Sequence, residues 1–506
     1  MFPERPQPQL PSIRRPAPKL MFKSLRTIFL CALALAVLAA GAGPAHASSK
    51  QVTIMQDDGL LFRSGGAVRD QTLDEMKALG ADVIKAQVYW NEISPRVRRK
   101  PSGFNSADPA SYDFSAYDAL VRAIVARGMT PFLVIGNRAP DWAVKKVTKS
   151  PHDGIYRPDR KEFRLFAQAV GRRYSGDYNG LPRVGLWSVW NEANLSSWLA
   201  PQRSKKGVPI APSLYRNLYL AGRGGLADTG HGSDTILLGE LMPLGAGSRS
   251  KFTPTDFLRE MVCLDRAYRP YRGKAAKARG CPKRLRRIPT SGIALHPYLP
   301  RAGLRARPRA GEVPITRLST MTRQLDLLGR RGKLPRRLPI WLTEFGFQTN
   351  PPDPFQTPIK RVPGMMDQSE WVAFRNRRVR SYSQYTLRDE GLKPGSRFQR
   401  YSGFQMGLRF ASGKAKKGVY DAFRMPVFVR RLSSRRVEVF GGLRTGGRAQ
   451  VRIESRRRGA RYRPLGKARL SSAGYFRKVF NVSGANDRTY RVTIGGHRRV
   501  KKPVTP

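Results

Sequence analysis

Residues 186–195, with the sequence LWSVWNEANL, form an apolar run that ends abruptly in Asn191 and Glu192. A short run of this composition is typical of a buried strand. A carboxylate is costly to place beside so much apolar surface, so Glu192 is a candidate for chemistry. A second segment of the same kind, residues 339–347 with the sequence PIWLTEFGF, places Glu344 at its end.

Strand-like apolar runs alternate with amphipathic helical patterns from about residue 52 to residue 423. The expected strands are Val52–Met55, Asp82–Tyr89, Thr130–Ile135, Val184–Trp190, Thr235–Leu238, Gly292–Leu295, Pro339–Thr343 and Ser402–Gly407. The expected helices are Asp70–Leu79, Ser115–Arg127, Arg160–Tyr174, Ser213–Ala227, Thr255–Tyr268, Ile315–Gly329, Glu370–Leu387 and a short one from Tyr420. This alternation predicts an α/β fold with a parallel sheet, and eight such units predict a closed (β/α)8 TIM barrel. A doubly wound open sheet is the alternative, which the lack of a Gly-rich phosphate fingerprint after the first strand disfavours.

The character of the chain changes after Pro426. Short runs then alternate apolar and polar residues with period 2, and Gly-rich turns separate them. Basic residues dominate this part, against only Glu438, Glu454 and Asp487. We expect a small C-terminal antiparallel β-sandwich. The predicted organisation is an extension with a signal peptide (1–47), a barrel (48–429) and a basic module (430–506).

The N-terminal region has the pattern of an export signal. A basic stretch at residues 21–26 precedes an apolar stretch at 27–40 and the small-residue cleavage pattern Ala45-His46-Ala47. The sequence therefore predicts a secreted, extracellular protein, and association with the cell envelope is left open. Whether translation starts at Met1 or at Met21 is also left open.

Cleavage would remove Cys31 and leave Cys263 and Cys281. An even pair in an exported chain predicts one disulfide, with two free buried thiols as the alternative. Neither the spacing nor the neighbours of these cysteines indicate a metal site, and no cofactor is expected.

The chain of 506 residues carries 94 Lys and Arg against 35 Asp and Glu, a formal net charge of +59. A strongly cationic surface favours anionic partners, such as an anionic cell-envelope polymer bound through the basic C-terminal module. Ordinary solvated Arg-rich faces are the alternative reading. Specific nucleic-acid binding is not expected, since export removes the usual target and no recognised motif is present. The oligomeric state is not predicted.

Glu192 and Glu344 end the fourth and seventh predicted strands, and in a barrel of this type catalytic groups lie where strands end. A pair of carboxyl groups at about 5–5.5 Å is what retaining glycosidic cleavage uses: one donates a proton and the other attacks the anomeric carbon. Surface ion pairs are the alternative reading of both residues. Glu92 and Glu240 also follow strands and compete for the roles.

Several neighbours suit a sugar site. Asn191 is a neutral donor for a sugar 2-hydroxyl, and Tyr298 is placed to donate to Glu344 and hold it ionised. His296 is a candidate to contact substrate or tune a neighbour's protonation, with a structural role as the alternative. Trp90 and Trp142 offer flat faces for stacking on sugar rings, with plain core packing as the alternative.

Three motifs give the chain a resemblance to a known family. The sequences WNEAN at 190–194, HPY at 296–298 and WLTEFG at 341–346 resemble the clan A glycoside hydrolases, which include cellulase-like and xylosidase-like barrels. The resemblance covers about residues 52–426. It implies retaining hydrolysis of a β-glycosidic bond, with Glu192 as acid/base, Glu344 as nucleophile and Asn191 as the ligand of the 2-hydroxyl.

The chain departs from that family at two positions. Many members carry an Arg on the second strand that braces the nucleophile, where this chain offers Lys85, which lacks the bidentate fork of Arg. Many also carry a Trp on the eighth strand under the sugar, where the predicted strand offers Phe404 or Gln405.

The sequence thus predicts a secreted retaining glycosidase acting on a polysaccharide or oligosaccharide. The alternative is a non-catalytic protein that binds the cell envelope or an anionic glycan on a barrel scaffold. We also expect that deleting residues 430–506 would weaken envelope association and spare activity on a soluble substrate.

Overall fold

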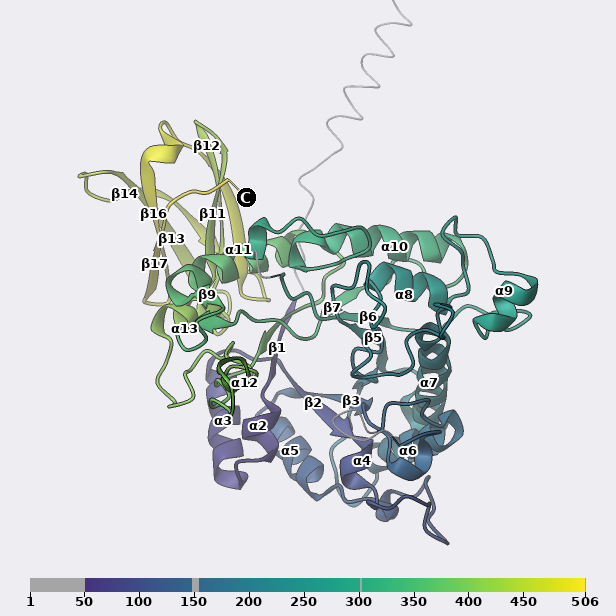
Figure 1. The fold of residues 1–506 in the computed structure, drawn as a ribbon. Helices are drawn as coiled ribbons and strands as arrows, with labels where there is room; N and C mark the ends of the chain where they lie inside the picture. Colours follow the sequence, from purple (N-terminus) through teal and green to yellow (C-terminus); the bar gives the residue numbers. More distant parts are fainter. Residues whose placement is uncertain (1–50, 148–153, 301–302, 506) are drawn as a thin grey trace, which may run out of the picture. The chain divides into compact units, whose positions relative to one another are not determined.

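Eight parallel strands form the central sheet of the computed structural model, which describes residues 51–147, 154–300 and 303–505 (Figure 1). Their order is β10-β1-β2-β3-β4-β5-β6-β7. The strands are β1 (Val52–Gln56), β2 (Val83–Tyr89), β3 (Thr130–Gly136), β4 (Leu186–Val189), β5 (Thr235–Leu241), β6 (Gly292–Leu295), β7 (Ile340–Leu342) and β10 (Ser381–Tyr385). The N–H of Ile340 in β7 donates to the carbonyl of Arg378, and the N–H of Arg380 donates back to Ile340. These two bonds join the edges of the sheet, so the predicted (β/α)8 barrel is confirmed.

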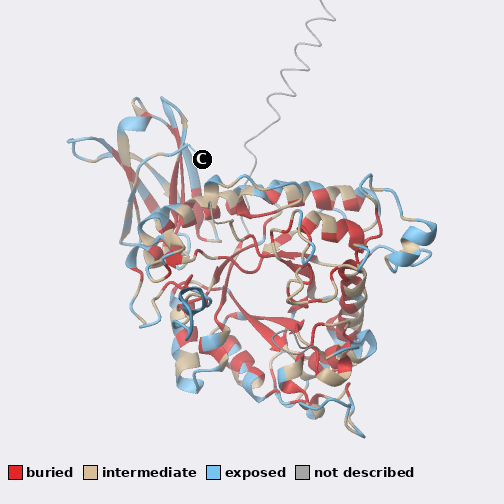
Figure 2. Cartoon of the chain, viewed as in Figure 1, coloured by how far each residue is buried: buried red, intermediate tan, exposed pale blue. Residues whose placement is uncertain are grey.

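Helices cover the outside of the strands. The main ones are α3 (Gly66–Ala78), α5 (Ser115–Ala126), α6 (Arg160–Arg173), α7 (Ala211–Leu226), α8 (Pro254–Met261), α10 (Leu318–Arg330), α11 (Val362–Arg375) and α13 (Lys417–Arg424). Figure 2 shows buried residues along the strands and on the helix faces turned toward them. A separate cluster that includes Ile54, Phe132 and Leu237 fills the inside of the barrel, so the strands enclose packed side chains.

The eighth strand differs from the prediction. Residues 370–387 were expected to be one helix, but α11 ends at Arg375 and β10 begins at Ser381. Residues 402–407 form no strand. The sequence of β10 is SYSQY, and its polar side chains hide the apolar run by which a buried strand is recognised. The buried Ser381 hydroxyl donates a hydrogen bond to the carbonyl of Leu342. This bond makes the burial of a polar side chain in the barrel wall tolerable.

The C-terminal part is an antiparallel β-sandwich, as predicted. One sheet has the order β11-β12-β15 and the other the order β14-β13-β16-β17. The strands are β11 (Val427–Ser433), β12 (Arg436–Gly442), β13 (Gln450–Arg457), β14 (Arg463–Arg469), β15 (Tyr475–Asn481), β16 (Arg488–Ile494) and β17 (His497–Lys501). Buried Val439 from the first sheet and Ile453 from the second belong to one apolar core.

The sandwich shares a buried interface with α11 of the barrel. Trp371 and Phe374 pack with Phe428, Phe440 and Tyr475 in one apolar cluster. Polar contacts flank this cluster: the Trp371 indole donates to the Glu438 carboxylate at 2.6 Å. The barrel and the sandwich are therefore joined by a separate apolar cluster.

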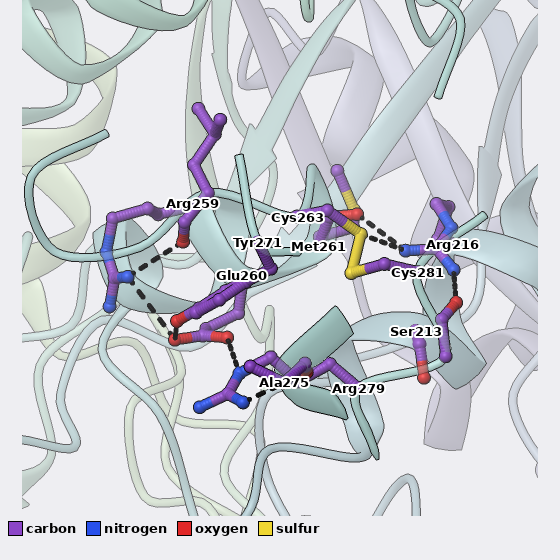
Figure 3. The surroundings of a disulfide bond; sticks show 12 residues. Ser213, Arg216, Arg259, Glu260, Met261, Cys263, Tyr271, Ala275, Arg279 and Cys281 are labelled. Carbon is purple, nitrogen blue, oxygen red and sulfur yellow. Dashed lines mark hydrogen bonds and ion pairs between the residues drawn. A yellow bond between two sulfur atoms is a disulfide. The ribbon is translucent and has the colours of Figure 1, made fainter. Parts of the chain in front are cut away.

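A disulfide links Cys263 to Cys281, with their Cα atoms 5.9 Å apart (Figure 3). The predicted pairing is confirmed. The buried Arg216 donates to the carbonyls of Met261 and Gly280, one beside each cysteine. Burial lowers the pKa of Arg216 to about 10. The disulfide and Arg216 together fix the two ends of the loop between Cys263 and Cys281, which contains α9 (Gly273–Ala278).

The predicted signal peptide and both candidate start residues lie outside the described residues. Among the residues that are described, no helix combines the length and the apolar character that crossing a membrane requires.

Candidate active site

Four titratable side chains meet at the C-terminal ends of neighbouring strands. Glu192 follows β4, Glu240 lies near the end of β5, His296 follows β6 and Glu344 follows β7. The backbone N–H of Glu192 donates to the carbonyl of Glu240 at 2.9 Å. Glu192 and Glu240 have φ angles of 37° and 52°, a region that non-glycine residues seldom occupy. Such conformations concentrate at functional sites.

His296 connects three carboxylates. Its Nδ1 lies 2.9 Å from Glu192 Oε1 and 3.3 Å from Glu344 Oε2, and its Nε2 lies 2.7 Å from Glu240 Oε2. Burial disfavours the imidazolium, but Glu344, Glu192 and Glu240 outweigh it and raise the pKa of His296 to about 9. His296 is therefore protonated at neutral pH and donates from both nitrogens.

The shared nitrogen limits how far apart Glu192 and Glu344 lie. Their nearest oxygens are separated by less than the sum of 2.9 and 3.3 Å, because both contact His296 Nδ1. Inverting pairs begin at about 6.5 Å and retaining pairs lie at about 5–5.5 Å. The side chains of Glu192 and Glu344 are 15% and 9% exposed, so both reach the solvent side of the network.

Lys85 of β2 lies beneath this pair. Its fully buried ammonium donates to Glu240 at 2.7 Å and to Glu344 at 2.8 Å. Burial disfavours the charge, but the two carboxylates outweigh that effect and raise the pKa of Lys85. The pKa of Glu240 is lowered to about 2, since Lys85 and His296 outweigh its burial. Lys85 therefore braces Glu344 with one hydrogen bond. Because Lys lacks the two-pronged guanidinium of Arg, its position is fixed by a second bond, to Glu240.

Sequence reasoning treated Glu240 only as a competitor of Glu192. The structure places it at the centre of the network, fully buried and also accepting from the Thr343 hydroxyl at 2.9 Å. The signal was present, because the fifth predicted strand leads directly into GEL at 239–241. The other competitor, Glu92, is exposed in α4 (Trp90–Ile93).

Polar neighbours complete the surroundings of Glu344. The Tyr298 hydroxyl donates to Glu344 Oε2 at 3.2 Å, the contact expected from the sequence. Gln87 of β2 donates to Glu344 Oε1 at 3.3 Å and accepts from the Asn137 amide at 3.1 Å. Asn191 is 3% exposed, and its Oδ1 has no hydrogen-bond partner among the described residues. Glu344 thus accepts hydrogen bonds from several directions, while Glu192 Oε1 contacts His296.

Trp90 and Trp142, the two tryptophans expected to stack on sugar rings, lie in or beside the apolar core. Trp90 is fully buried and stacks on Phe166 at a centroid distance of 5.2 Å, which leaves no ring face for a sugar. Trp142 is partly buried and packs edge-on against Trp90 at 5.8 Å. Both belong to or border the apolar core on the α6 side of the barrel.

The aromatic residue at the end of the eighth strand is Tyr385. Phe404 and Gln405 were expected there, but neither lies on a strand. The Phe404 ring is 40% exposed and lies 5.1 Å from the Tyr385 ring. The expected position of Phe404 on the eighth strand followed from the wrong strand assignment and is corrected with it.

Glu240, His296 and Glu344 offer ligand atoms within 4.8 Å of one another, close enough to hold a metal ion. Metal binding requires a neutral imidazole, whereas His296 bonds carboxylates through both nitrogens. Lys85 also contacts both carboxylates and supplies the positive charge that a metal would bring. The residues fit an ion-pair network better than a metal site.

The network makes stability depend on pH through His296. The folded-state pKa of about 9 lies above the ordinary value of 6.5, so the protonated ring stabilises the fold fully below about pH 6.5. That contribution disappears as the pH rises through about 9. We expect the difference in unfolding free energy between wild type and His296→Gln to shrink by about 3 kcal/mol over this window. Urea unfolding of both proteins from pH 6 to 10 measures it, and parallel pH profiles of the two proteins would contradict it.

The comparisons with known proteins give likeness in structure alone. No family model and no curated protein match the chain. An exo-β-1,4-mannosidase from Opitutaceae bacterium strain TAV5 is 14% identical, with a TM-score of 0.45 over 74% of this chain and 58% of that chain. GH5_18 from Bifidobacterium longum subsp. longum is 12% identical, with a TM-score of 0.43 over 74% and 78%. A putative β-galactosidase from Bacteroides fragilis is 12% identical, with a TM-score of 0.42 over 90% and 54%.

The chain spans less than two thirds of the length of the mannosidase and of the putative β-galactosidase. Nothing is concluded from these comparisons, because the TM-scores lie below 0.5; the barrel is established by the strand order and the closing bonds. The roles of individual residues are argued below from the contacts within this chain.

Proposed function

We propose that this chain is a secreted glycoside hydrolase that cleaves β-glycosidic bonds by double displacement. The observation that carries the proposal is the shared contact of Glu192 and Glu344 with one nitrogen of His296 at the strand ends. This contact keeps the nearest oxygens of the two carboxyl groups less than the sum of 2.9 and 3.3 Å apart, which supports a retaining pair.

The different surroundings of the two carboxyl groups support different roles. Glu344 accepts hydrogen bonds from Lys85, Gln87 and Tyr298, and these bonds hold its carboxylate in a fixed position, as a nucleophile requires. Glu192 is the more exposed of the pair and exchanges protons with solvent more readily. The resemblance to clan A enzymes assigns the same roles.

The reaction has two steps. Glu344 attacks the anomeric carbon while Glu192 transfers its proton to the leaving oxygen, which leaves a glycosyl ester on Glu344. Glu192, now a carboxylate, takes a proton from water as the water oxygen attacks the anomeric carbon and releases Glu344. Asn191 binds the sugar 2-hydroxyl next to the reacting carbon. The Lys85 ammonium and the His296 imidazolium lie next to Glu344 and attract its carboxylate when it is released.

A screen of aryl β-glycosides and β-glucans tests the proposal. We expect release of aglycone or reducing sugar from at least one substrate by wild type. A double variant, Glu192→Gln with Glu344→Gln, controls for contaminating activity and should release nothing. A panel without any hydrolysis would favour the non-catalytic alternative.

Export is a further part of the proposal. It is supported by the signal pattern in residues 1–47 and by the disulfide, which persists in oxidising compartments. Sequencing the N-terminus of the protein recovered from culture medium tests it, with Ser48 as the expected first residue.

We also propose that the outer face of sheet β14-β13-β16-β17 binds an anionic cell-envelope polymer. Lys467, Arg452, Thr493 and Arg498 stand opposite one another in a single row across the four strands. The two residues that flank Arg452 in β13 are buried, so this row points away from the sandwich core. A row that holds three cations is suited to a polymer with repeated negative charges.

Charge reversal tests this surface. We expect the triple variant Arg452→Glu, Lys467→Glu and Arg498→Glu to bind immobilised polygalacturonate at least about 10-fold more weakly than wild type at low salt. Reversal of the exposed Arg284, Arg286 and Arg287 changes the net charge equally and serves as the matched control. Equal losses in both triple variants would show attraction to net charge alone.

A further inference from the structure

Three neighbouring strands end in hydrogen-bonding groups that the reaction described above does not use. Asp58 follows β1, Tyr89 is the last residue of β2, and Tyr385 is the last residue of β10. These strands are adjacent in the order β10-β1-β2. Each of the three side chains is partly exposed, which places them at the solvent side of the barrel end.

Strand geometry brings the three groups and Glu344 to one region: Gln56 stands opposite Tyr385 in the register of β1 and β10, the Gln56 amide donates to Asp58, and β7, which precedes Glu344, adjoins β10. The Asp58 carboxyl and Glu344 both act on Tyr89 and Tyr385: burial, together with these carboxyl groups, raises the pKa of both phenols. Burial is also the main reason that the pKa of Asp58 is raised to about 7, with Glu344 adding to it. Asp58, Tyr89 and Tyr385 therefore line the Glu344 side of the site, which we name the β1 subsite.

Several polar atoms of the β1 subsite have no hydrogen-bond partner in the described part of the chain. Among the described residues, Asp58 Oδ1 is buried without a hydrogen bond, while Oδ2 accepts from the Gln56 amide at 2.9 Å. Gln56 is 1% exposed, and its Oε1 has no partner either. Within the same part of the chain, no hydrogen bond is made by the hydroxyls of Tyr89 or Tyr385. Unpaired buried groups are costly, so a ligand that pairs them is favoured.

The charges around the β1 subsite limit the kind of ligand. The cations next to Glu344 are Lys85 and His296, and both are fully buried and already bound to carboxylates. The other titratable groups there are the partly exposed carboxyl groups of Glu192 and Asp58 and the carboxyl group of Glu344, whose side chain is 9% exposed. A uronic acid would place its own carboxylate against these groups without a free cation from Lys85 or His296.

We propose that Asp58, Tyr89 and Tyr385 form a glycone subsite that binds the hydroxyl groups of an uncharged sugar ring and selects against uronic acids. This inference rests on the proposed glycosidase function and names its substrate class. Asp58 accepts a sugar hydroxyl at Oδ1, and the two phenols donate to or accept from neighbouring hydroxyls. A ring that lacks such a hydroxyl leaves Asp58 unpaired and is rejected for that reason.

The test compares nitrophenyl β-glycosides of glucose, galactose, mannose, xylose and glucuronic acid on wild type, Asp58→Ala and Tyr385→Phe. We expect wild type to cleave its best neutral substrate at least about 100-fold more efficiently than the glucuronide. Asp58→Ala should lower kcat/KM for that neutral substrate by about 10- to 100-fold. Asp58→Ala should also lower the ratio of kcat/KM for the neutral substrate to kcat/KM for the glucuronide. Asp70→Ala removes an exposed carboxyl group from α3 and serves as the matched control.

Two outcomes would overturn the subsite: efficient cleavage of the glucuronide, or an unchanged kcat/KM in Asp58→Ala. Either one leaves the glycosidase proposal standing. If wild type cleaves no glycoside, the glycosidase proposal fails, and NMR titration of wild type and Asp58→Ala with the neutral glycosides decides the subsite. Binding that depends on Asp58 would support it, and equal or absent binding to both proteins would reject it.

Discussion

Replacement of Glu344 by Gln is expected to lower kcat by about 10⁴-fold or more on any substrate of the wild type, an effect of the size seen when a nucleophile is removed. The substitution keeps the shape of the side chain and retains an acceptor for Lys85. The loss would therefore come from the missing nucleophile. Single-turnover and steady-state assays on an activated aryl β-glycoside measure it.

Two further variants give this expectation its controls. Glu192→Ala should lose activity on poor leaving groups and regain it with azide on an activated substrate, because azide attacks the glycosyl ester without a general base. Glu92→Gln changes an exposed glutamate close to the site and should keep wild-type activity. Full activity in Glu344→Gln would remove the basis of the proposed mechanism.

Replacement of Arg444 by Met is expected to destabilise the whole protein by about 3–5 kcal/mol, as breaking a buried ion pair from one side does. The Arg444 guanidinium of the sandwich donates to Glu370 of α11 at 2.6 Å, and both side chains are almost fully buried. It also donates to the Thr53 hydroxyl in β1 at 3.2 Å. Without Arg444, the one partner left to the Glu370 carboxylate among the described residues would be the Tyr475 hydroxyl.

The same contacts argue against the expectation that deletion of residues 430–506 spares activity. Deletion would expose Trp371 and Phe374 and leave Glu370 without either partner. Urea unfolding of Arg444→Met, followed by tryptophan fluorescence and by activity, should show one shifted transition in both signals. Arg491→Met breaks the more exposed ion pair with Glu454 in the same sandwich and should change little. Separate transitions, with the activity midpoint unchanged, would show that the barrel is stable without the sandwich.

The barrel and the meeting of Glu192 with Glu344 at the strand ends were predictable because both leave a local signal. Alternating apolar runs and amphipathic helices define the eight units, and Glu192 and Glu344 each end an apolar run. The eighth strand was misplaced because several of its buried side chains are polar: Ser381 donates to the carbonyl of Leu342 and Gln384 donates to the carbonyl of Met406. No local pattern distinguishes such a strand from a helix.

The ion-pair network escaped prediction for a different reason. Lys85 and Glu240 are 155 residues apart and meet only when the second and fifth strands face the same interior. Taken alone, each reads as a misplaced charge in an apolar strand. Their pairing became apparent only in three dimensions, where one ammonium contacts two buried carboxylates.

The central claim is that Glu192 and Glu344 act as a retaining pair, and the anomeric configuration of the first product tests it most directly. Proton NMR of an aryl β-glycoside reaction should show the β-anomer of the free sugar first, with the α-anomer appearing later by mutarotation. If the α-anomer appears first, water attacks the substrate directly and Glu344 is not the nucleophile.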